Sequence, residues 1–321
     1  MLTTPTDLVE YRETPDFREP EVIAQGLISA VAGFLAQLVD GSLGMGFGTI
    51  TMTFLLGLGI APAVASASVN VATIGTGLVS AAAHHRFRNV HWPTALALGV
   101  PGAIGGLAGA WALVSLTNLD AATPVTSSIL IALGIAIVWR FAKSSGTHHG
   151  SRPDRKYLTV PTGLAGGFLA AAGGGGWGPV TMPIMLTTSR LAPNQVVGSV
   201  STAQVAASAA AVVGFWLAIP ESLTVLWPLV VGMAVGGMIA APIAAWLTRK
   251  IPTARLGSTI GFLVVGLNLR TLLGNFNLSW QLSTVLFTLI ALAWVASLVI
   301  PGKRTTAGIV APKAEPVEAE A

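Results

Sequence analysis

Long apolar segments without a charged residue determine what this chain can fold into. Trp92 to Leu119 and Thr224 to Leu247 contain no Asp, Glu, Lys or Arg. Each is longer than the ~20 residues that an α-helix needs to cross a hydrocarbon core about 30 Å thick. The segments also lack the alternation of polar and apolar residues that a transmembrane barrel requires. The sequence therefore predicts an all-α membrane protein that crosses the bilayer several times.

The composition agrees with that class. Hydrophobic residues make up 53% of the chain, charged residues make up 9%, and the mean hydropathy is +0.73. A soluble domain carries about a quarter charged residues, so most of this surface does not face water. The absence of cysteine excludes disulfides and thiolate metal sites. The histidines fall in predicted loops with no carboxylate at ligand spacing, so we expect neither a metal nor a cofactor.

Hydropathy predicts eleven helical segments. Two pairs stand out, 23–39 with 46–58 and 157–172 with 178–189, because the second member of each is too short to cross an ordinary bilayer. We interpret each pair as a hairpin that enters and leaves the membrane on one side, or as two short tilted helices. The predicted segments are 23–39, 46–58, 62–82, 93–116, 124–142, 157–172, 178–189, 194–217, 225–248, 257–274 and 281–300.

The basic residues predict how the chain is oriented. Clusters of Lys and Arg follow the segments 62–82, 124–142, 225–248 and 281–300, whereas the loops at 117–123 and 218–224 contain neither residue. Cytoplasmic loops of membrane proteins carry such an excess of positive charge. We therefore expect the N-terminus outside and the C-terminus in the cytoplasm. The same loops account for the sequence pI of about 9.9, so no nucleic-acid partner is implied.

The chain also repeats itself weakly. GFLA occurs at Gly33 and at Gly167, and GTITMTFLL at Gly48 recurs as GPVTMPIML at Gly178. Each unit holds one hairpin and three spans, an odd number of crossings, which predicts that the second unit is inverted relative to the first. The predicted organisation is a polar N-terminal tail (1–21), a first transmembrane repeat (22–143), a cytoplasmic linker (144–156), an inverted second repeat (157–275), an extra helix (276–300) and a C-terminal tail of disordered composition (301–321).

Glycine clusters interrupt the predicted helices at matching places in both repeats. Residues 171–180 read AAGGGGWGPV, and residues 41–48 read GSLGMGFG. Irregular backbone at membrane depth is tolerated only where it is buried in protein or lines a polar cavity. Inverted repeats with interrupted helices in matching positions are typical of secondary transporters that bind their substrate near the midplane. The sequence therefore predicts that the two breaks meet and form a binding site.

The residues that carry these features resemble the sulfite exporter TauE/SafE family. The resemblance rests on GFLAQLVDGSLGMGFG at residues 33–48 and GGFLAAAGGGGWGPV at residues 166–180, each followed by a small-residue helix, ASASVN or GSVSTAQ. It covers nearly all of residues 23–275. The resemblance implies a transporter in the bacterial cell (inner) membrane that moves small sulfur-containing anions such as sulfite or organosulfonates.

The broken helices have the chemistry of an anion site. Helices that begin near Gly48 and Gly178 present free N–H groups and about half a unit of positive charge, which bind anions without a fixed cation. Polar residues on the following helices add neutral hydrogen bonds, although such residues also serve as interhelical hydrogen bonds and glycine as a packing notch. The candidate substrate-binding residues are Gly44, Gly46, Gly48, Ser68, Asn70, Thr73, Gly174, Gly175, Gly176, Trp177, Gly178, Ser199, Ser201, Thr202, Gln204 and Arg270.

Three residues near the predicted site have two interpretations each. Trp177 is a candidate gate of the cavity or an anchor at a membrane interface. Arg270 is a candidate cation near the anion path, or a side chain that extends to the interface. Asp40 is a candidate proton relay or a helix-end cap. By contrast, the small-residue stretches GAIGGLAGA and GGMIAAPIAA are expected to be packing faces.

The sequence predicts a secondary transporter of small anions that works by alternating access, with the lipid bilayer and a small anionic substrate as its partners. A passive anion channel and a transporter of an unrelated small organic anion are the nearest alternatives. An intramembrane enzyme would need a nucleophile, an acid–base pair or a metal within the spans, and the sequence provides no His or Cys there. A membrane scaffold would leave the broken helices unexplained. The sequence does not decide between a monomer and a homodimer.

Overall fold

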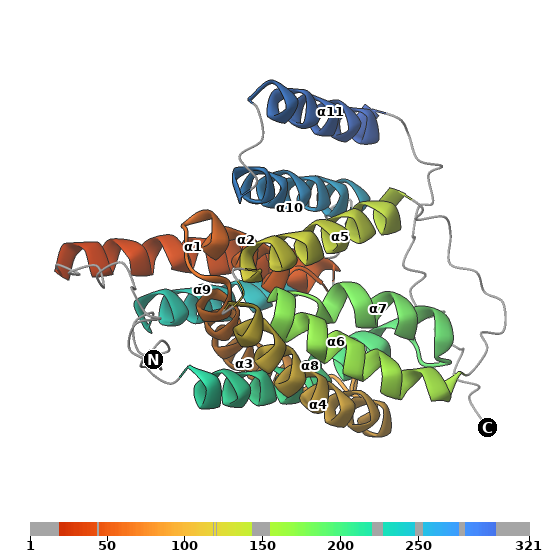
Figure 1. Ribbon diagram of the computed structural model, residues 1–321. Helices are drawn as coiled ribbons and strands as arrows, with labels where there is room; N and C mark the ends of the chain where they lie inside the picture. Colours follow the sequence, from red (N-terminus) through yellow and green to blue (C-terminus); the bar gives the residue numbers. More distant parts are fainter. Residues whose placement is uncertain are drawn as a thin grey trace, which may run out of the picture.

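The described part of the protein is all-α, as predicted. The computed structural model describes residues 19–43, 45–117, 119, 121–142, 155–219, 227–247, 253–275 and 280–299. Within these ranges it contains eleven α-helices, one short 3-10 helix and no strand (Figure 1). The helices are α1 (Glu19–Leu43), α2 (Phe47–Gly57), α3 (Pro62–Arg86), α4 (Trp92–Thr117), α5 (Ala122–Ala142), η2 (Lys156–Leu158), α6 (Thr159–Gly173), α7 (Trp177–Thr188), α8 (Pro193–Ala218), α9 (Trp227–Leu247), α10 (Thr253–Asn275) and α11 (Trp280–Val299).

The helix boundaries follow local signals in the sequence. Pro62 and Pro193 stand at the start of α3 and α8, where the missing N–H of proline is not needed and its fixed φ suits the first turn. Every helix end lies within four residues of the predicted position. The start of α1 lies at Glu19, inside the segment predicted as a polar tail, whereas the predicted start is residue 23. The start of α10 lies at Thr253, whereas the predicted start is residue 257.

Several helices have the length and composition of membrane spans. Five meet that description within the described residues, and shorter apolar helices accompany them. The short helices α2 and α7 contain 11 and 12 residues, which at 1.5 Å per residue is about 17–18 Å. Neither crosses a 30 Å core by itself. The five spans are Ile23–Asp40, Pro62–Arg86, Trp92–Thr117, Ala122–Trp139 and Asn194–Ala218.

The helices of the two halves pack against each other in a matched pattern. The sequence repeat makes α1 to α5 equivalent to α6 to α10 in order. α1 packs along α9, and its equivalent α6 packs along α4. The helices α3 and α8 pack against each other, as do α5 and α10. Exchanging the equivalent helices therefore turns the α1–α9 contact into the α6–α4 contact, and turns the α3–α8 and α5–α10 contacts into themselves.

Small residues allow the long helices to approach closely. A methyl group on Gly105 or Gly109 of α4 would lie 2.1 or 2.3 Å from a backbone oxygen of α6. On the other half, a methyl group on Gly33 of α1 would lie 2.3 Å from the carbonyl oxygen of Met233 in α9. Distances this short leave room only for hydrogen, so the prediction of a packing face is confirmed for GAIGGLAGA. The helix α11 lies at one edge of the molecule beyond α10 (Figure 1).

Candidate functional site

The two helix breaks, which are about 130 residues apart in the sequence, are in direct contact. A methyl group on Gly48 would lie 2.4 Å from the carbonyl oxygen of Gly174. A methyl group on Gly175 would lie 2.3 Å from the amide nitrogen of Thr49. Only glycine allows the two backbones to come this close, so the prediction that the breaks meet is confirmed.

The break between α6 and α7 is stabilised by hydroxyl groups from the other helices. α6 ends at Gly173, and the next residue, Gly174, has a left-handed φ of +69°, which favours glycine. The last turn of a helix leaves carbonyl oxygens without partners. Here the Ser66 hydroxyl of α3 donates to the Ala171 carbonyl, and the Thr126 hydroxyl of α5 donates to the Ala172 carbonyl at 3.3 Å. Two carbonyl oxygens at the end of α6 thus find hydrogen-bond donors inside the protein, as membrane depth requires.

The two short helices differ at their N-termini. α2 follows Gly46, which has a φ of +137°, and the N–H of Phe47 donates to Oδ1 of Asp40 at 3.2 Å. The helix-cap interpretation of Asp40 is therefore confirmed. α7 begins at Trp177 after Gly176, and within the described residues no hydrogen bond from a side chain caps it. The positive end of α2 already faces a carboxylate, whereas that of α7 is open to a ligand.

A small polar cavity lies where the breaks meet. It has about 10 Å³ of room for the centre of a water molecule, which is about the space that one water needs. Sulfite is larger than this space, so the conformation described is closed around the site. Among the described residues, the lining consists of Asp40, Gly46, Gly48, Asn70, Thr73, Ala170, Gly174, Gly175, Trp177, Gly178, Gln204 and Ser208.

Most of the predicted site residues line this cavity. Two pairs that the repeat makes equivalent, Gly48 with Gly178 and Thr73 with Gln204, contribute to it together. The Asn70 side chain is held by a hydrogen bond to the Ser66 carbonyl at 2.8 Å. The predicted residues that line the cavity are Gly46, Gly48, Asn70, Thr73, Gly174, Gly175, Trp177, Gly178 and Gln204.

The other predicted residues lie elsewhere. Ser199 accepts a hydrogen bond from the His91 amide at 2.9 Å, and so links α8 to the start of α4. The hydroxyls of Ser68 and Thr202 donate to carbonyls one turn back in their own helices. Gly176, Ser201 and the exposed Arg270 of α10 are not among the lining residues, and Gly44 lies outside the described residues.

Three lining residues, Asp40, Ala170 and Ser208, were absent from the predicted set of site residues. The sequence contains a signal for Ser208. Ser208 follows Gln204 by four residues on α8, and residues spaced by four share one face of a helix. Ala170 contributes no polar group and has no such signal. Asp40 was predicted near the turn, but its place in the cavity wall depends on how α1 is rotated, which the sequence does not reveal.

Trp177 is part of the cavity wall and not an interface anchor. Its side chain is 1% exposed, and its indole Nε1 donates to the Val200 carbonyl of α8 at 3.0 Å. The ring fits against Gly102 of α4 and Gly166 of α6, where added methyl groups would lie 2.7 and 3.3 Å from it. The interface interpretation of Trp177 is therefore wrong, because a belt tryptophan keeps one edge at the membrane surface.

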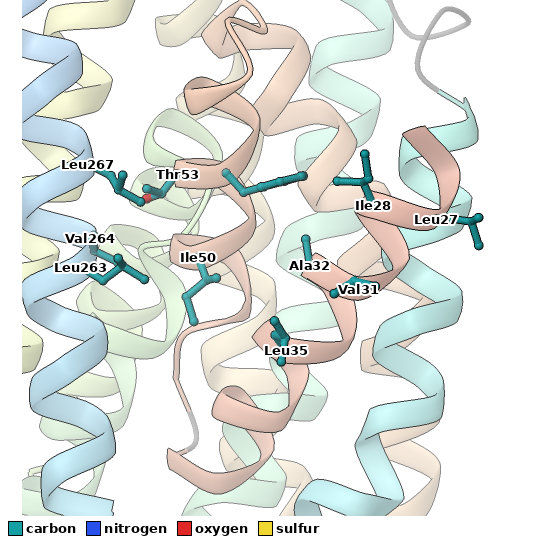
Figure 2. A pocket seen from close by; sticks show the side chains of 11 residues that line it. Leu27, Ile28, Val31, Ala32, Leu35, Ile50, Thr53, Leu263, Val264 and Leu267 are labelled. Carbon is teal, nitrogen blue, oxygen red and sulfur yellow. The ribbon is translucent and has the colours of Figure 1, made fainter. Parts of the chain in front are cut away.

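A larger cavity than the central one lies elsewhere in the described part of the protein. It has a volume of about 500 Å³ and lies between α1, α2 and α10. Figure 2 shows its apolar lining, with Leu27 and Val31 from α1 and Leu267 from α10, and with Thr53 as its polar residue. An apolar groove of this kind suits lipid chains and provides no group to hold an anion, so it is not the candidate site.

The comparison with protein families identifies the chain. The model of the family described as "Sulfite exporter TauE/SafE" matches residues 29–271, which include both breaks and all the residues that line the cavity. The chain belongs to this family. It is also 38% identical over 275 residues to the "Probable membrane transporter protein YtnM" of Bacillus subtilis (strain 168), a match that covers 85% of this chain and 91% of that protein. No solved structure matches the chain.

Membership in the TauE/SafE family establishes the general class. The protein is a multi-pass membrane transporter and not an enzyme. The region that matches the family model begins within α1, ends within α10 and leaves α11 outside. The glycine breaks and the residues that line the polar cavity thus lie within the matched region.

Proposed function

We propose that the protein is a secondary transporter that moves small anions, sulfite, organosulfonates or related sulfur oxyanions, across the cytoplasmic membrane by alternating access of two inverted halves. The observation that carries this proposal is the contact between the two broken helices around a polar cavity. The family adds the substrate class, since its description is that of a sulfite exporter.

The chemistry of the cavity suits an oxyanion that must be released again. The open N-terminus of α7 offers backbone N–H groups at Trp177 and Gly178. Asn70, Thr73 and Gln204 add neutral side chains. No Lys or Arg is among the described residues that line the cavity. A helix N-terminus holds an anion by about half a unit charge and directed N–H groups, which binds less tightly than an arginine clamp and favours turnover.

The arrangement of the helices suits motion of one half against the other. The matched contacts, α1 with α9 and α6 with α4, place each hairpin against the opposite half. The equivalent pairs Gly48/Gly178 and Thr73/Gln204 put the cavity on the boundary between the halves. Because the cavity has room for about one water, substrate binding requires the halves to separate. That requirement favours a carrier over a permanently open channel.

The inverted arrangement predicts that the two ends of the chain lie on opposite sides of the membrane. Because the chain has no cysteine, single variants Glu10→Cys and Val310→Cys report the two ends without interference. An impermeant thiol reagent is expected to label Glu10→Cys in intact cells and Val310→Cys only after the membrane is permeabilised. If both cysteines are labelled from the same side of the membrane, the two repeats do not each cross the membrane an odd number of times. That result would contradict the inversion of the second repeat.

Counterflow in proteoliposomes tests the transport function. Vesicles that contain the purified protein and a high internal concentration of unlabelled sulfonate or sulfite are expected to accumulate the labelled anion transiently, with a saturable rate. A large flux that does not saturate would indicate a channel. A panel of sulfite, organosulfonates, thiosulfate, sulfate and carboxylates identifies the substrate, and counterflow with carboxylates alone would indicate an unrelated organic anion.

A further inference from the structure

Asp40 is the ionisable side chain of the central cavity. No other Asp, Glu, Lys, Arg or His is among the described residues that line the cavity. Seven of the α-helices, α2, α4, α6, α7, α8, α9 and α11, contain no residue of these five types. The ionisable residues of the remaining α-helices, besides Asp40, are Glu19, Glu21, His84, His85, Arg86, Arg140, Arg255 and Arg270.

The helices packed against α1 bring no described counter-charge to the cavity. α1 packs against α2, α9 and α10, and of these three only α10 carries ionisable residues. Arg270 of α10 is exposed and is not a lining residue, and the side chain of Arg255 lies outside the described residues. On α3, which lines the cavity with Thr73, the nearest ionisable residue is His84, eleven residues further on, or about 16 Å along the helix.

The structural contact of Asp40 does not require a charge. Its Oδ1 accepts a hydrogen bond from the N–H of Phe47 at 3.2 Å, and asparagine or serine forms a helix cap of this kind equally well. A carboxylate at membrane depth costs free energy, and residues of this type mark ion pathways and proton relays in membrane proteins. The charge at residue 40 therefore needs a reason beyond the cap.

The repeat places this carboxylate in one half alone. The alignment of Gly33 with Gly167 makes Asp40 equivalent to Gly174, which has no side chain. The equivalent short helix α7 begins with no side-chain hydrogen bond to its cap within the described residues. A structural need common to both halves thus does not account for Asp40, and the cavity between the halves has one carboxylate among its described lining residues.

An anion in this cavity lies close to the Asp40 carboxylate, because both broken helices line the same small space. Like charges at such a distance repel each other, and no Lys or Arg among the described lining residues offsets the repulsion. A proton on Asp40 removes the repulsion. The protonated carboxyl then donates a hydrogen bond to the anion and still accepts the one from Phe47. Binding of the proton and binding of the anion therefore favour each other, and by the same factor.

We propose that Asp40 couples anion transport to protons: it takes up one proton from water as the anion binds and returns that proton to water as the anion leaves, so that both cross the membrane together. This inference rests on the proposed function for the transported anion. With a monovalent sulfonate, the anion and the proton together carry no net charge. Net transport then follows the combined gradients of anion and proton, and export occurs when the excess of anion inside outweighs the proton gradient.

Uptake of methanesulfonate into proteoliposomes tests the coupling. This anion stays ionised over the pH range of the assay, so a change of pH acts on the protein and not on the solute. We expect the initial rate of uptake of the labelled anion to be about tenfold higher when the outside solution is more acidic than the inside than at equal pH. Nigericin, which dissipates the pH gradient, is expected to remove this increase.

Asp40→Asn keeps the cap of α2 and is expected to lose the response to the pH gradient, although it still exchanges labelled for unlabelled anion. The matched control is Arg270→Gln, which removes a charge from an exposed side chain outside the cavity lining and is expected to keep the response. Uptake by the original chain that does not depend on pH would overturn the coupling and leave the transport function in place. A response that persists in Asp40→Asn would also overturn the proposal.

Proton uptake by the purified protein tests the same linkage without transport. Addition of methanesulfonate to the original chain in weakly buffered detergent solution, with a pH-sensitive dye, is expected to make the solution more alkaline, by at most about one proton per protein. Asp40→Asn is expected to give no change. If counterflow is absent but this proton uptake is present and depends on Asp40, the transport function is wrong and the linkage stands. If both are absent, the linkage is rejected as well.

Discussion

Gly175→Val is expected to abolish anion counterflow, while the protein still inserts into the membrane. The amide nitrogen of Thr49 would lie only 2.3 Å from the first carbon of any side chain at residue 175. Valine therefore drives the two breaks apart and fills the space between them. Overpacking of this kind costs about 1–3 kcal/mol, which is less than the typical stability of a folded protein. The central cavity, not the fold, is expected to be lost.

The measurement is the initial rate of counterflow, with the elution profile of the purified protein as the test of folding. Gly266→Val is the matched control, since Gly266 lies within α10 and has no atom within 4 Å of an added methyl group. The control is expected to retain its rate.

Gly48→Ala is the reciprocal variant and is expected to lower the rate of counterflow by about tenfold or more, because its methyl group meets Gly174 from the other side. Full activity of Gly175→Val would show that the contact of the breaks is not part of the transport path.

The sequence predicts the helices well because each boundary depends on local signals. Pro62, Pro193 and the glycine clusters mark starts and interruptions that no distant contact has to specify. The meeting of the two breaks was also predictable, since the repeat puts irregular backbone in both halves and membrane depth requires that such backbone be covered. The closeness of Gly48 to Gly175 then follows from the absence of side chains at both positions.

The sequence is less informative about which face of a helix points into the cavity. Thr73 and Gln204 line it, whereas Ser68 and Ser199, which the repeat also makes equivalent, do not. Ser199 instead binds the backbone at His91. These differences depend on the rotation of α3 and α8 against their neighbours, and weakly amphipathic helices in a membrane carry little pattern from which that rotation can be read.

Asp40 introduces a negative charge into a site proposed for anions. Its carboxylate lines the cavity and caps α2 through the N–H of Phe47. At an effective dielectric constant of 20, two like charges about 5 Å apart repel each other by ~3 kcal/mol, which corresponds to about a hundredfold in affinity. The carboxylate therefore competes with the substrate for the positive ends of the short helices. Such competition weakens the hold on the anion and promotes its release.

Removal of this charge is expected to make substrate binding tighter. In Asp40→Asn the side-chain oxygen still accepts the hydrogen bond from Phe47, since asparagine is as good a helix cap as aspartate. The KM for the anion is expected to fall by about tenfold or more, and the maximal rate is expected to fall as well, because release becomes slower. The KM and the maximal rate are both measured from the dependence of the counterflow rate on the anion concentration at a fixed pH.

Gln204→Glu is the matched variant of opposite sign. Gln204 lines the same cavity, and glutamate has nearly the same shape but adds a second negative charge. Its KM is expected to rise by a factor similar to that by which Asp40→Asn lowers it. An Asp40→Asn protein with the KM of the original chain would mean that the transported anion never comes near α2, and that the uncapped start of α7 holds it alone. A fall in KM for Asp40→Asn together with a rise for Gln204→Glu would support an anion that binds close to the space between the two broken helices, because both side chains line that space and lie on different helices.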